Sequence, residues 1–423
     1  MTMRIKAPLI AALAIALATA LAAGTAGACT TTIGVVMSLT GPAGAYGQAG
    51  AKAVQMAFRD INKAGGAAGC TLAADIRDAQ TSGSVAVDQA KQLVDVEHVP
   101  GIIGGIISSV TLPILTAVTA PAKVPQISPA SSSPTLTTLG EEGKTNGIFF
   151  RTITSDALQG VVAAQYAMSL GYKKLAIIHV NNDFGANMVR EFSAAYRKLG
   201  GTITSDTPYN EKQSSYAAEV TAAMAGKPDA LYLVSYPVDG ATIARAWISQ
   251  GGPQKFLLND GMDSAGFIKA VGAKYLDHAF GTSSGTEPTA STAYFNRNFK
   301  AFSKLDPGSP GAVQSYDAAA IMGLAVAIAG KPDPAAITAG IRAAVDPKGT
   351  PITAGPAGFR KALALIKAHK PIRYVGVIGP ISFDKVGDIT GPFRKWKIAG
   401  GKVVTTGQVS TAAVTKLVAR LGN

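Results

Sequence analysis

Short apolar runs, many of them rich in β-branched residues, recur along the chain and are separated by alanine-rich stretches with helical spacing. Because this alternation is typical of β-α-β units, it predicts an α/β fold with parallel sheets. The sequence has 423 residues, more than a single hydrophobic core usually supports, so we expect two lobes. The predicted strands cover residues 33–37, 72–76, 101–107, 123–127, 175–180, 201–204, 230–234 and 255–258.

The predicted helices carry recognisable start and stop signals. A helical repeat of apolar residues runs through 44–63 and ends at a Gly-Gly pair. Ser133 is a good N-cap residue, and Pro134 follows it at the first helical position, where a missing N–H is harmless. Ser155 or Asp156 is expected to cap the next helix in the same way.

The N-terminal segment 1–28 has the pattern of a signal peptide. Arg4 and Lys6 precede an apolar run over 9–23, and small residues occupy positions −3 and −1 before Cys29. The pattern predicts export to the periplasm and cleavage before Cys29, with a lipid anchor on the Cys29 thiol as the less favoured alternative. No later segment is expected to cross a membrane, and 282–292, rich in Ser, Thr and Gly, is expected to be a loop.

Charge and cysteine content narrow the class of protein. Without Arg4 and Lys6, 37 basic and 26 acidic residues remain, a formal charge of +11 that is scattered rather than gathered in runs. This scatter disfavours a nucleic-acid partner and leaves an anionic membrane surface or an acidic docking partner open. Cys29 and Cys70 each stand just before a predicted strand, so we expect a disulfide between them in an oxidising compartment, with two free thiols as the alternative. No coiled-coil pattern is present, which favours a monomer.

Polar residues follow the predicted strands of the first half. Such clusters lie at 38–46, 108–111 and 128–133, and they are rich in Ser, Thr and Gly. Ligands of open parallel sheets bind beyond the carboxyl ends of the strands, where hydroxyls and free N–H groups at helix starts attract an anion. The pattern predicts a carboxylate site, although each Ser taken alone is as well explained as a helix cap.

The second half supplies a different set of groups after its strands, at 181–184, 235–237 and 259–261. Asp260 is the acid placed where it could hold an ammonium group, because a buried carboxylate needs a cation as partner. The alternative interpretation is an Asp that caps the following helix.

Catalytic, metal and phosphate sites receive little support. The four histidines, His98, His179, His278 and His369, lack metal-ligand spacing, and the sequence contains neither a CxxC pair nor a phosphate-binding glycine motif. Residues 281–285 match GxSxG, and Asp317 and His369 follow in the order of a serine hydrolase. The helix that should follow this motif directly is missing. We therefore expect no enzyme activity, no cofactor and no metal.

Several motifs in the right order resemble the leucine/isoleucine/valine-binding family of ABC-transporter substrate-binding proteins, over nearly the whole chain after the signal segment. They are Ser38-Leu39-Thr40-Gly41-Pro42 with Tyr46-Gly47, Ala57-Phe58-Arg59-Asp60-Ile61-Asn62, Gly104-Gly105 to Ser108-Ser109, Ile127-Ser128-Pro129-Ala130, Phe150-Arg151-Thr152, Asp183-Phe184-Gly185 and Ser315-Tyr316-Asp317.

The resemblance implies a type I periplasmic binding protein fold, with two Rossmann-like lobes joined by three crossovers. The expected crossovers lie near Phe150, Thr282 and Val377. Lobe 1 would comprise 29–149 and 284–376, and lobe 2 would comprise 150–283 and 377–423.

The resemblance also implies a binding site between the lobes. In lobe 1, Ser108, Ala130 and Ser132 would hold the ligand carboxylate, and Tyr46 and Ile107 would line the pocket. Lobe 2 would bring Phe184, Tyr236 and Asp260, with Asp260 paired to the α-ammonium group. The implied function is an extracytoplasmic receptor that closes on a small amino acid, branched-chain or otherwise apolar, and delivers it to an ABC permease complex in the membrane.

Three departures from the family pattern leave the ligand's side chain open. Asp260 replaces a longer Glu, Phe184 replaces a Tyr, and a small Cys-bridged loop is absent, its two positions falling near Gln80 and Ile107. An aromatic or other simple carboxylate, an amide or urea are therefore alternative ligands. A sensory binding protein is an alternative to the importer role.

Overall fold

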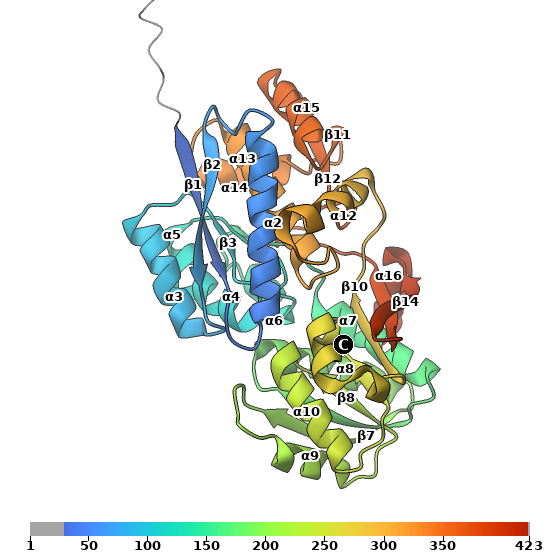
Figure 1. Cartoon of the computed structure of the whole chain (residues 1–423). Coiled ribbons are helices and arrows are strands. Elements are labelled where there is room, and N and C mark those ends of the chain that lie inside the picture. Colours follow the sequence, from blue (N-terminus) through green and yellow to red (C-terminus); the bar gives the residue numbers. More distant parts are fainter. Residues whose placement is uncertain (1–28, 422–423) are drawn as a thin grey trace, which may run out of the picture.

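The computed structural model describes residues 29–421, and the predicted signal peptide lies outside them. Two β-sheets form the centres of two α/β lobes (Figure 1). The upper lobe in this view contains the blue and cyan first part of the chain together with orange segments from beyond residue 290. The lower lobe contains the green and yellow middle part and the red C-terminal segment. Each lobe is thus built from stretches that are far apart in the sequence.

The first lobe contains a parallel sheet with strand order β2-β1-β3-β4-β5. Its strands are β1 (Thr30–Met37), β2 (Thr71–Asp78), β3 (Ile102–Gly104), β4 (Gln126–Ser128) and β5 (Phe149–Arg151). Its helices are α2 (Gly44–Asn62), α3 (Gly83–Lys91), α4 (Ser108–Ile114), α5 (Ala120–Ala122) and α6 (Pro134–Glu141), with π-helical turns at Gln92–Val96 and Leu115–Thr119. Polar residues at the ends of β1, β3 and β4 therefore face the same edge of the sheet.

Later segments return to this lobe and complete its core. They are α12 (Ala290–Ser303), α13 (Ala312–Ala329), α14 (Pro334–Ala343), α15 (Pro356–Lys367) and a separate parallel pair, β11 (Thr350–Thr353) and β12 (Ile372–Val375). Helix α13 packs along α2 and is long and apolar enough to cross a membrane by length and composition. Because 78% of its 18-residue window is buried within the protein, we assign α13 to the core.

The second lobe contains a seven-stranded sheet with order β14-β13-β10-β9-β8-β6-β7. Its strands are β6 (Lys174–Val180), β7 (Thr202–Tyr209), β8 (Ala230–Val234), β9 (Phe256–Leu258), β10 (Ala279–Ser284), β13 (Phe393–Ala399) and β14 (Lys402–Val409). Its helices are α7 (Asp156–Ser169), α8 (Asp183–Lys198), α9 (Ala217–Met224), α10 (Pro237–Ser249), α11 (Ala265–Val271) and α16 (Thr411–Leu421), with 3₁₀ turns at Asp260–Met262 and Ala273–Tyr275. Strand β13 runs antiparallel to both β10 and β14, so this sheet is mixed.

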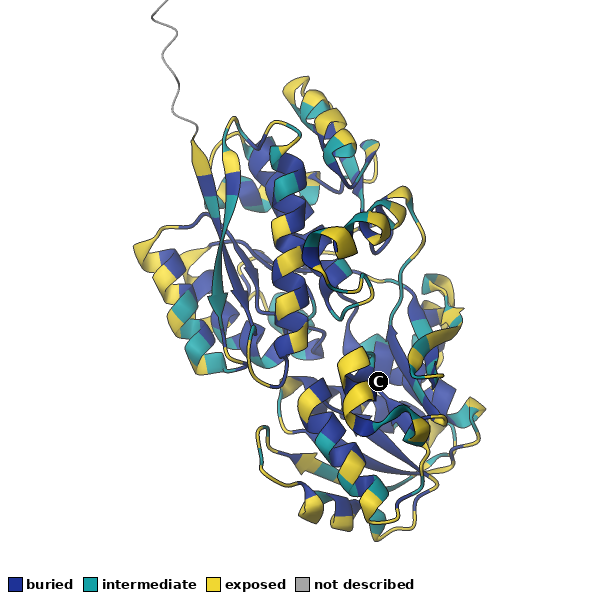
Figure 2. Cartoon of the chain, viewed as in Figure 1, coloured by how far each residue is buried: buried dark blue, intermediate teal, exposed yellow. Residues whose placement is uncertain are grey.

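The sheets carry the buried apolar residues, and the outer faces of the helices carry the exposed ones (Figure 2). Residues predicted from apolar runs are at the centre of both sheets: Val35 and Val36 in β1 and Ile177 and Ile178 in β6 are fully buried. The predicted loop at 282–292 is shorter than expected, because β10 extends to Ser284 and α12 begins at Ala290.

The chain passes between the two sheets at three places, after β5, after β10 and between β12 and β13. The exact lobe limits stay a prediction. Between β12 and β13, Asp388 forms a two-pronged ion pair with the fully buried Arg151 of β5, with Nε–Oδ1 and Nη2–Oδ2 distances of 2.6 Å each. This ion pair links the first crossing between the sheets, after β5, to the third crossing, between β12 and β13.

A disulfide joins Cys29 and Cys70, whose Cα atoms are 4.7 Å apart. The two cysteines precede β1 and β2, which pair in parallel from Thr30 opposite Thr71. This disulfide uses the thiol that a lipid anchor on Cys29 would need.

Candidate functional site

Helix caps orient the polar loops where the two lobes meet. The Ser133 hydroxyl accepts a hydrogen bond from the Thr135 N–H and thereby starts α6. In the other lobe, the Asn182 side-chain oxygen accepts from the N–H groups of Phe184 and Gly185 and starts α8. The predicted cap at Ser155 is present too, since its hydroxyl accepts from the Ala157 N–H. The loops after the strands are therefore fixed by their own sequences.

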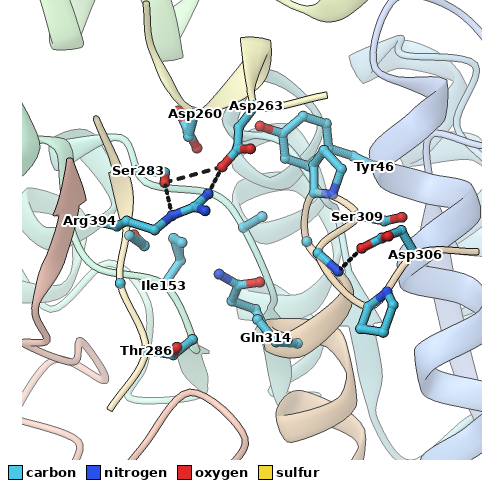
Figure 3. A pocket seen from close by; sticks show the side chains of 18 of the residues that line it. Tyr46, Ile153, Asp260, Asp263, Ser283, Thr286, Asp306, Ser309, Gln314 and Arg394 are labelled. Atoms are coloured by element: carbon cyan, nitrogen blue, oxygen red, sulfur yellow. Dashed lines mark hydrogen bonds and ion pairs between the residues drawn. The ribbon is translucent and has the colours of Figure 1, made fainter. Parts of the chain in front are cut away.

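A cavity of about 500 Å³ lies between the lobes (Figure 3). Tyr46, Ala130 and Gln314 line it from the first lobe, and Asp260 and Arg394 line it from the second. Its size is within the range usual for small-molecule sites, about 300–1,000 Å³. Tyr46, Ala130 and Asp260 are thus brought together as the sequence led us to expect.

Asp260 is a partly buried carboxyl group that lines this cavity. Burial raises the pKa of Asp260, and hydrogen bonds from Asn259, from backbone N–H groups and from Gln159 oppose the shift. The Asn259 amide donates to Asp260 Oδ1 at 3.2 Å. Among residues 29–421, no Lys, Arg or His forms a salt bridge with Asp260. An uncompensated buried carboxylate is costly, so this position is suited to a ligand cation.

Tyr46 approaches Asp260 from the opposite lobe. Its side chain is buried, and burial followed by the Asp260 charge raises the pKa of the Tyr46 phenol well above its usual range. The phenol therefore keeps its proton and can donate it in a hydrogen bond. Tyr46 is on the first turn of α2, directly after the polar loop that follows β1.

Asp156 is a site residue whose role the sequence did not reveal. It begins α7, is fully buried and accepts a hydrogen bond from the Ser132 hydroxyl at 2.8 Å. Burial and the nearby Asp260 charge raise the pKa of Asp156 well above its usual range. The sequence indicated only a helix cap, because nothing local to Asp156 shows that Ser132 and Asp260 converge on it.

The other hydroxyl residues predicted for the first lobe, Ser108 and Ser132, do not belong to the lining of the cavity. Ser108 is buried, and its oxygen accepts from the Ser133 N–H at 3.1 Å, which leaves its own proton free to be donated. Ile107, directly before it, is also buried. Ser132 donates to Asp156, so its hydroxyl proton is already used in the structure.

Two aromatic side chains of the second lobe stack on each other outside the cavity lining. Phe184 and Tyr236 are stacked with ring centroids 5.7 Å apart and an interplanar angle of 23°. The Tyr236 hydroxyl accepts from the Asn182 amide at 3.3 Å, and burial raises the pKa of Tyr236 well above its usual range. Both rings are buried, and neither belongs to the lining of the 500 Å³ cavity.

The buried side chain of Arg151 supports the loop formed by residues 131–133. The Arg151 Nη1 group donates to the carbonyl oxygens of Ser131 and Ser133, at 3.2 and 3.0 Å, on either side of Ser132. Its Nη2 group donates to Thr137 at 2.7 Å. The Arg151–Asp388 pair therefore positions the loop that faces the ligand cavity.

The contacts of the GxSxG motif do not match those of a hydrolase triad. Ser283 is in strand β10 and contacts Asp263 and Arg394. Asp317 accepts hydrogen bonds from the N–H groups of Val377 and Ile378 and from the Tyr374 hydroxyl, and none of its contacts involves His369. Within the part of the chain that the structure describes, no group of three or more His, Cys, Asp or Glu residues is arranged to hold a metal.

Two α/β lobes with a cavity between them define a two-lobed binding protein. The chain belongs to the periplasmic binding protein family, whose model matches residues 30–377. The similarity to leucine/isoleucine/valine-binding receptors and the type I fold are thereby confirmed. The family is one of solute-binding proteins, consistent with the expectation that the chain is not an enzyme.

Curated relatives support this assignment over most of the chain. The Leu/Ile/Val-binding protein homolog 3 of Brucella melitensis is 27% identical over 380 residues, 88% of this chain and 92% of the relative. The chemotactic signal transduction system substrate-binding protein BasB of Halobacterium salinarum is 27% identical over 357 residues, 83% of this chain and 82% of the relative.

Solved structures share the fold. The leucine binding protein LivK of Thermotoga maritima aligns with a TM-score of 0.76 and 22% identity, covering 90% of this chain and 99% of LivK. A solute binding protein of R. palustris, solved in complex with benzoate, aligns with a TM-score of 0.73 and 17% identity, covering 90% of this chain and 96% of that protein.

Proposed function

We propose that this protein is an extracytoplasmic receptor that encloses a small amino acid between its lobes and delivers it to an ABC permease complex in the membrane. The observation that carries the proposal is the partly buried Asp260 carboxylate, which lines the inter-lobe cavity and has no cationic side chain as partner in the described chain. An α-ammonium group would supply the missing positive charge. The predicted signal peptide, with its cleavage site before Cys29, supports export to the periplasm.

In this proposal the two ends of the amino acid engage different lobes. The α-carboxylate binds at the Ser108 hydroxyl and at the backbone N–H groups of Ala130 and Ser132, because the Ser132 hydroxyl is donated to Asp156, and the α-ammonium group binds at Asp260. Each charge-assisted hydrogen bond contributes about 1.5–3 kcal/mol. Because only the closed arrangement satisfies both charged groups, the zwitterion itself favours closure. Tyr46 lines the cavity beside them, whereas Ile107, Phe184 and Tyr236 lie outside its lining in this structure and would contact the ligand only after a local rearrangement.

The names of the relatives support one more specific ligand and indicate two alternatives, one for the ligand and one for the role. Leu/Ile/Val-binding relatives favour a branched-chain or other apolar amino acid as ligand. The benzoate and 4-hydroxybenzoate complexes of fold neighbours make an aromatic carboxylate the alternative ligand. The chemotaxis relative makes a sensory role the alternative to import.

Thermal unfolding of the mature chain, beginning at Cys29, tests the ligand class. The twenty amino acids, benzoate and 4-hydroxybenzoate would be compared on the wild type and on Asp260→Asn, with the exposed Asp277→Asn as control. A ligand at 100 times its dissociation constant stabilises the fold by about 2.7 kcal/mol. Stabilisation by an amino acid that is lost only in Asp260→Asn supports the proposal. Stabilisation by benzoate alone, unchanged in Asp260→Asn, would contradict the zwitterion mechanism.

A further inference from the structure

A buried carboxyl group holds the start of the third crossing, directly after β12. Asp317 of α13 is fully buried, and its two oxygens accept hydrogen bonds from the N–H groups of Val377 and Ile378, at 2.8 Å each. The Tyr374 hydroxyl of β12 donates to Asp317 Oδ1 at 2.7 Å. Because α13 belongs to the core of the first lobe, these contacts fix the beginning of the crossing to that core.

The chain at this point forms a tight turn, 376–379. Gly376 and Gly379 exchange backbone hydrogen bonds with N–O distances of 2.9 and 3.3 Å, and Gly379 has a φ of +129°, which favours glycine. A Cβ atom at Gly376 would lie 2.6 Å from Asp317 Oδ2, so glycine permits the close approach of the carboxyl group. The Thr289 hydroxyl, which caps α12, donates to the Gly376 carbonyl oxygen at 2.9 Å. The turn is therefore held from two sides, by α13 and by the start of α12.

The groups around Asp317 are tyrosines rather than cations. Among residues 29–421, no Lys, Arg or His forms a salt bridge with Asp317. Burial raises the pKa of Asp317 to about 7, and hydrogen bonds from the two backbone N–H groups and from Tyr374 oppose the shift. Burial also raises the pKa of Tyr374 and of the neighbouring Tyr316 well above the usual range, so both phenols stay protonated. The Tyr316 hydroxyl donates at 2.9 Å to Asp60 of α2, the other acid whose charge acts on Tyr374.

Protonation of Asp317 would remove part of this hold. A charged carboxylate accepts at both oxygens, whereas a protonated carboxyl group carries a hydrogen on one of them. That hydrogen would face the N–H of Val377 or of Ile378, because the two N–H groups contact different oxygens. A cavity of about 260 Å³ lies beside Ile378 and is also lined by Thr152 of the first crossing and Gly285 of the second. A released turn would therefore have room to shift.

We propose that Asp317 is a proton-operated latch on the third crossing, which fixes the turn 376–379 when the carboxyl group is charged and releases it when the group is protonated. The crossings join the two lobes, so the protonation state of Asp317 sets how firmly one of these connections is held. The latch does not depend on the identity of the ligand, because Asp317, Tyr374 and the turn do not line the 500 Å³ inter-lobe cavity.

Hydrogen exchange of the ligand-free, oxidised protein, read by mass spectrometry and corrected for intrinsic exchange rates, tests the latch. We expect a peptide covering 374–380 to exchange about tenfold faster at about pH 6 than at about pH 8, while a peptide from β6 stays unchanged. Asp317→Asn keeps the shape but not the charge, so it should exchange fast at both pH values. Asp384→Asn is the matched control, because this exposed acid of the same crossing also accepts from two backbone N–H groups. It should keep the wild-type pH dependence.

Tyr374→Phe gives a second test if Asp317→Asn fails to fold. This change removes an O–H group that stabilises the charged carboxylate, so the midpoint of the exchange transition should move to higher pH. A purely structural contact would not move this midpoint. The latch is wrong if the wild type exchanges equally at both pH values, if Asp317→Asn is as protected as the wild type at the higher pH, or if Tyr374→Phe leaves the midpoint in place.

Discussion

The Asp260 carboxyl group is partly buried, lines the inter-lobe cavity and has no cationic side chain as partner in the described chain. Burial raises the pKa of Asp260 because the charged form loses its hydration. A bound ammonium group favours the charged form and pulls this pKa down again. Ligand binding and proton release at Asp260 are therefore linked.

We expect amino-acid binding to release protons and to weaken as the pH falls through the raised pKa of Asp260. The sign follows from the free protein, which holds the proton in the window between the lowered, ligand-bound pKa and the raised, free pKa. Calorimetry in buffers of different ionisation enthalpy, between about pH 4 and pH 8, measures the number of protons released. Asp260→Asn should abolish any release that comes from this group. Net proton uptake by the wild type on binding would contradict this assignment.

Single residues differed in how far the sequence could predict them. Asp260 was predictable because it directly follows a predicted strand, at the edge where ligands of parallel sheets bind. Asp156 was not, since its role arises from Ser132, 24 residues earlier, and from Asp260, which belongs to a different strand end. Arg394 was missed for a similar reason, because it enters the cavity from β13, which the strand pattern did not predict.

At the level of elements, the connection from β5 to the segment before β13 depends on Arg151. This fully buried side chain binds Asp388 with two hydrogen bonds and also holds the carbonyl oxygens around Ser132. A Lys keeps the charge but lacks the planar fork, so it cannot make these contacts together.

Arg151→Met should lower the free energy of unfolding by about 3–5 kcal/mol, because it leaves Asp388 unpaired in a largely buried position. Arg151→Lys should fall between this variant and the wild type. Urea denaturation measures both. Glu142→Gln, which breaks an exposed pair with Lys144, is the control and should change stability by less than about 1 kcal/mol. Similar small effects for all three variants would show that Arg151 does not hold the passages together.

The disulfide stabilises the start of the first sheet by closing a loop between β1 and β2. Its cysteines are 41 residues apart in the sequence. In the chain-entropy description, such a loop lowers the entropy of the unfolded state enough to add at most about 4 kcal/mol of stability. Cys70→Ala should therefore lower the unfolding temperature, and reductant should lower that of the wild type but not of Cys70→Ala. Equal unfolding of the wild type with and without reductant would mean that the bond contributes nothing.

At the level of the whole molecule, alternating apolar runs were enough to predict two α/β lobes, because the central strands are buried on both faces. The same signal is absent from β14, an edge strand in which no residue is fully buried. In strand β13 a register shift between Lys395 and Trp396 interrupts the alternation of buried and less buried residues. The antiparallel edge of the second sheet therefore depends on tertiary pairing with β10, which no local pattern reports.

The two lobes also contact each other directly, through residues that are not among those placed against the ligand. The Asn187 amide of α8 donates to the hydroxyls of Ser133 and Thr135 in the first lobe, at 3.0 and 3.1 Å. A second contact joins the lobes where the Lys212 ammonium group donates to the Gln80 carbonyl oxygen at 3.2 Å. Contacts that exist only when the lobes meet stabilise the closed state selectively.

Asn187→Ala should therefore weaken ligand binding by shifting the protein toward the open state, without removing any group that we place against the ligand. Loss of about 1 kcal/mol of closed-state stability corresponds to roughly fivefold weaker binding when the open state dominates without ligand. Calorimetry measures the affinity, and small-angle X-ray scattering measures the larger radius of gyration expected for the ligand-free variant. Asn298→Ala is the matched control, because Asn298 bonds a carbonyl four residues earlier, as Asn187 does, without contacting the other lobe. If Asn187→Ala and Asn298→Ala behave alike in both measurements, the α8 contact does not contribute to closure.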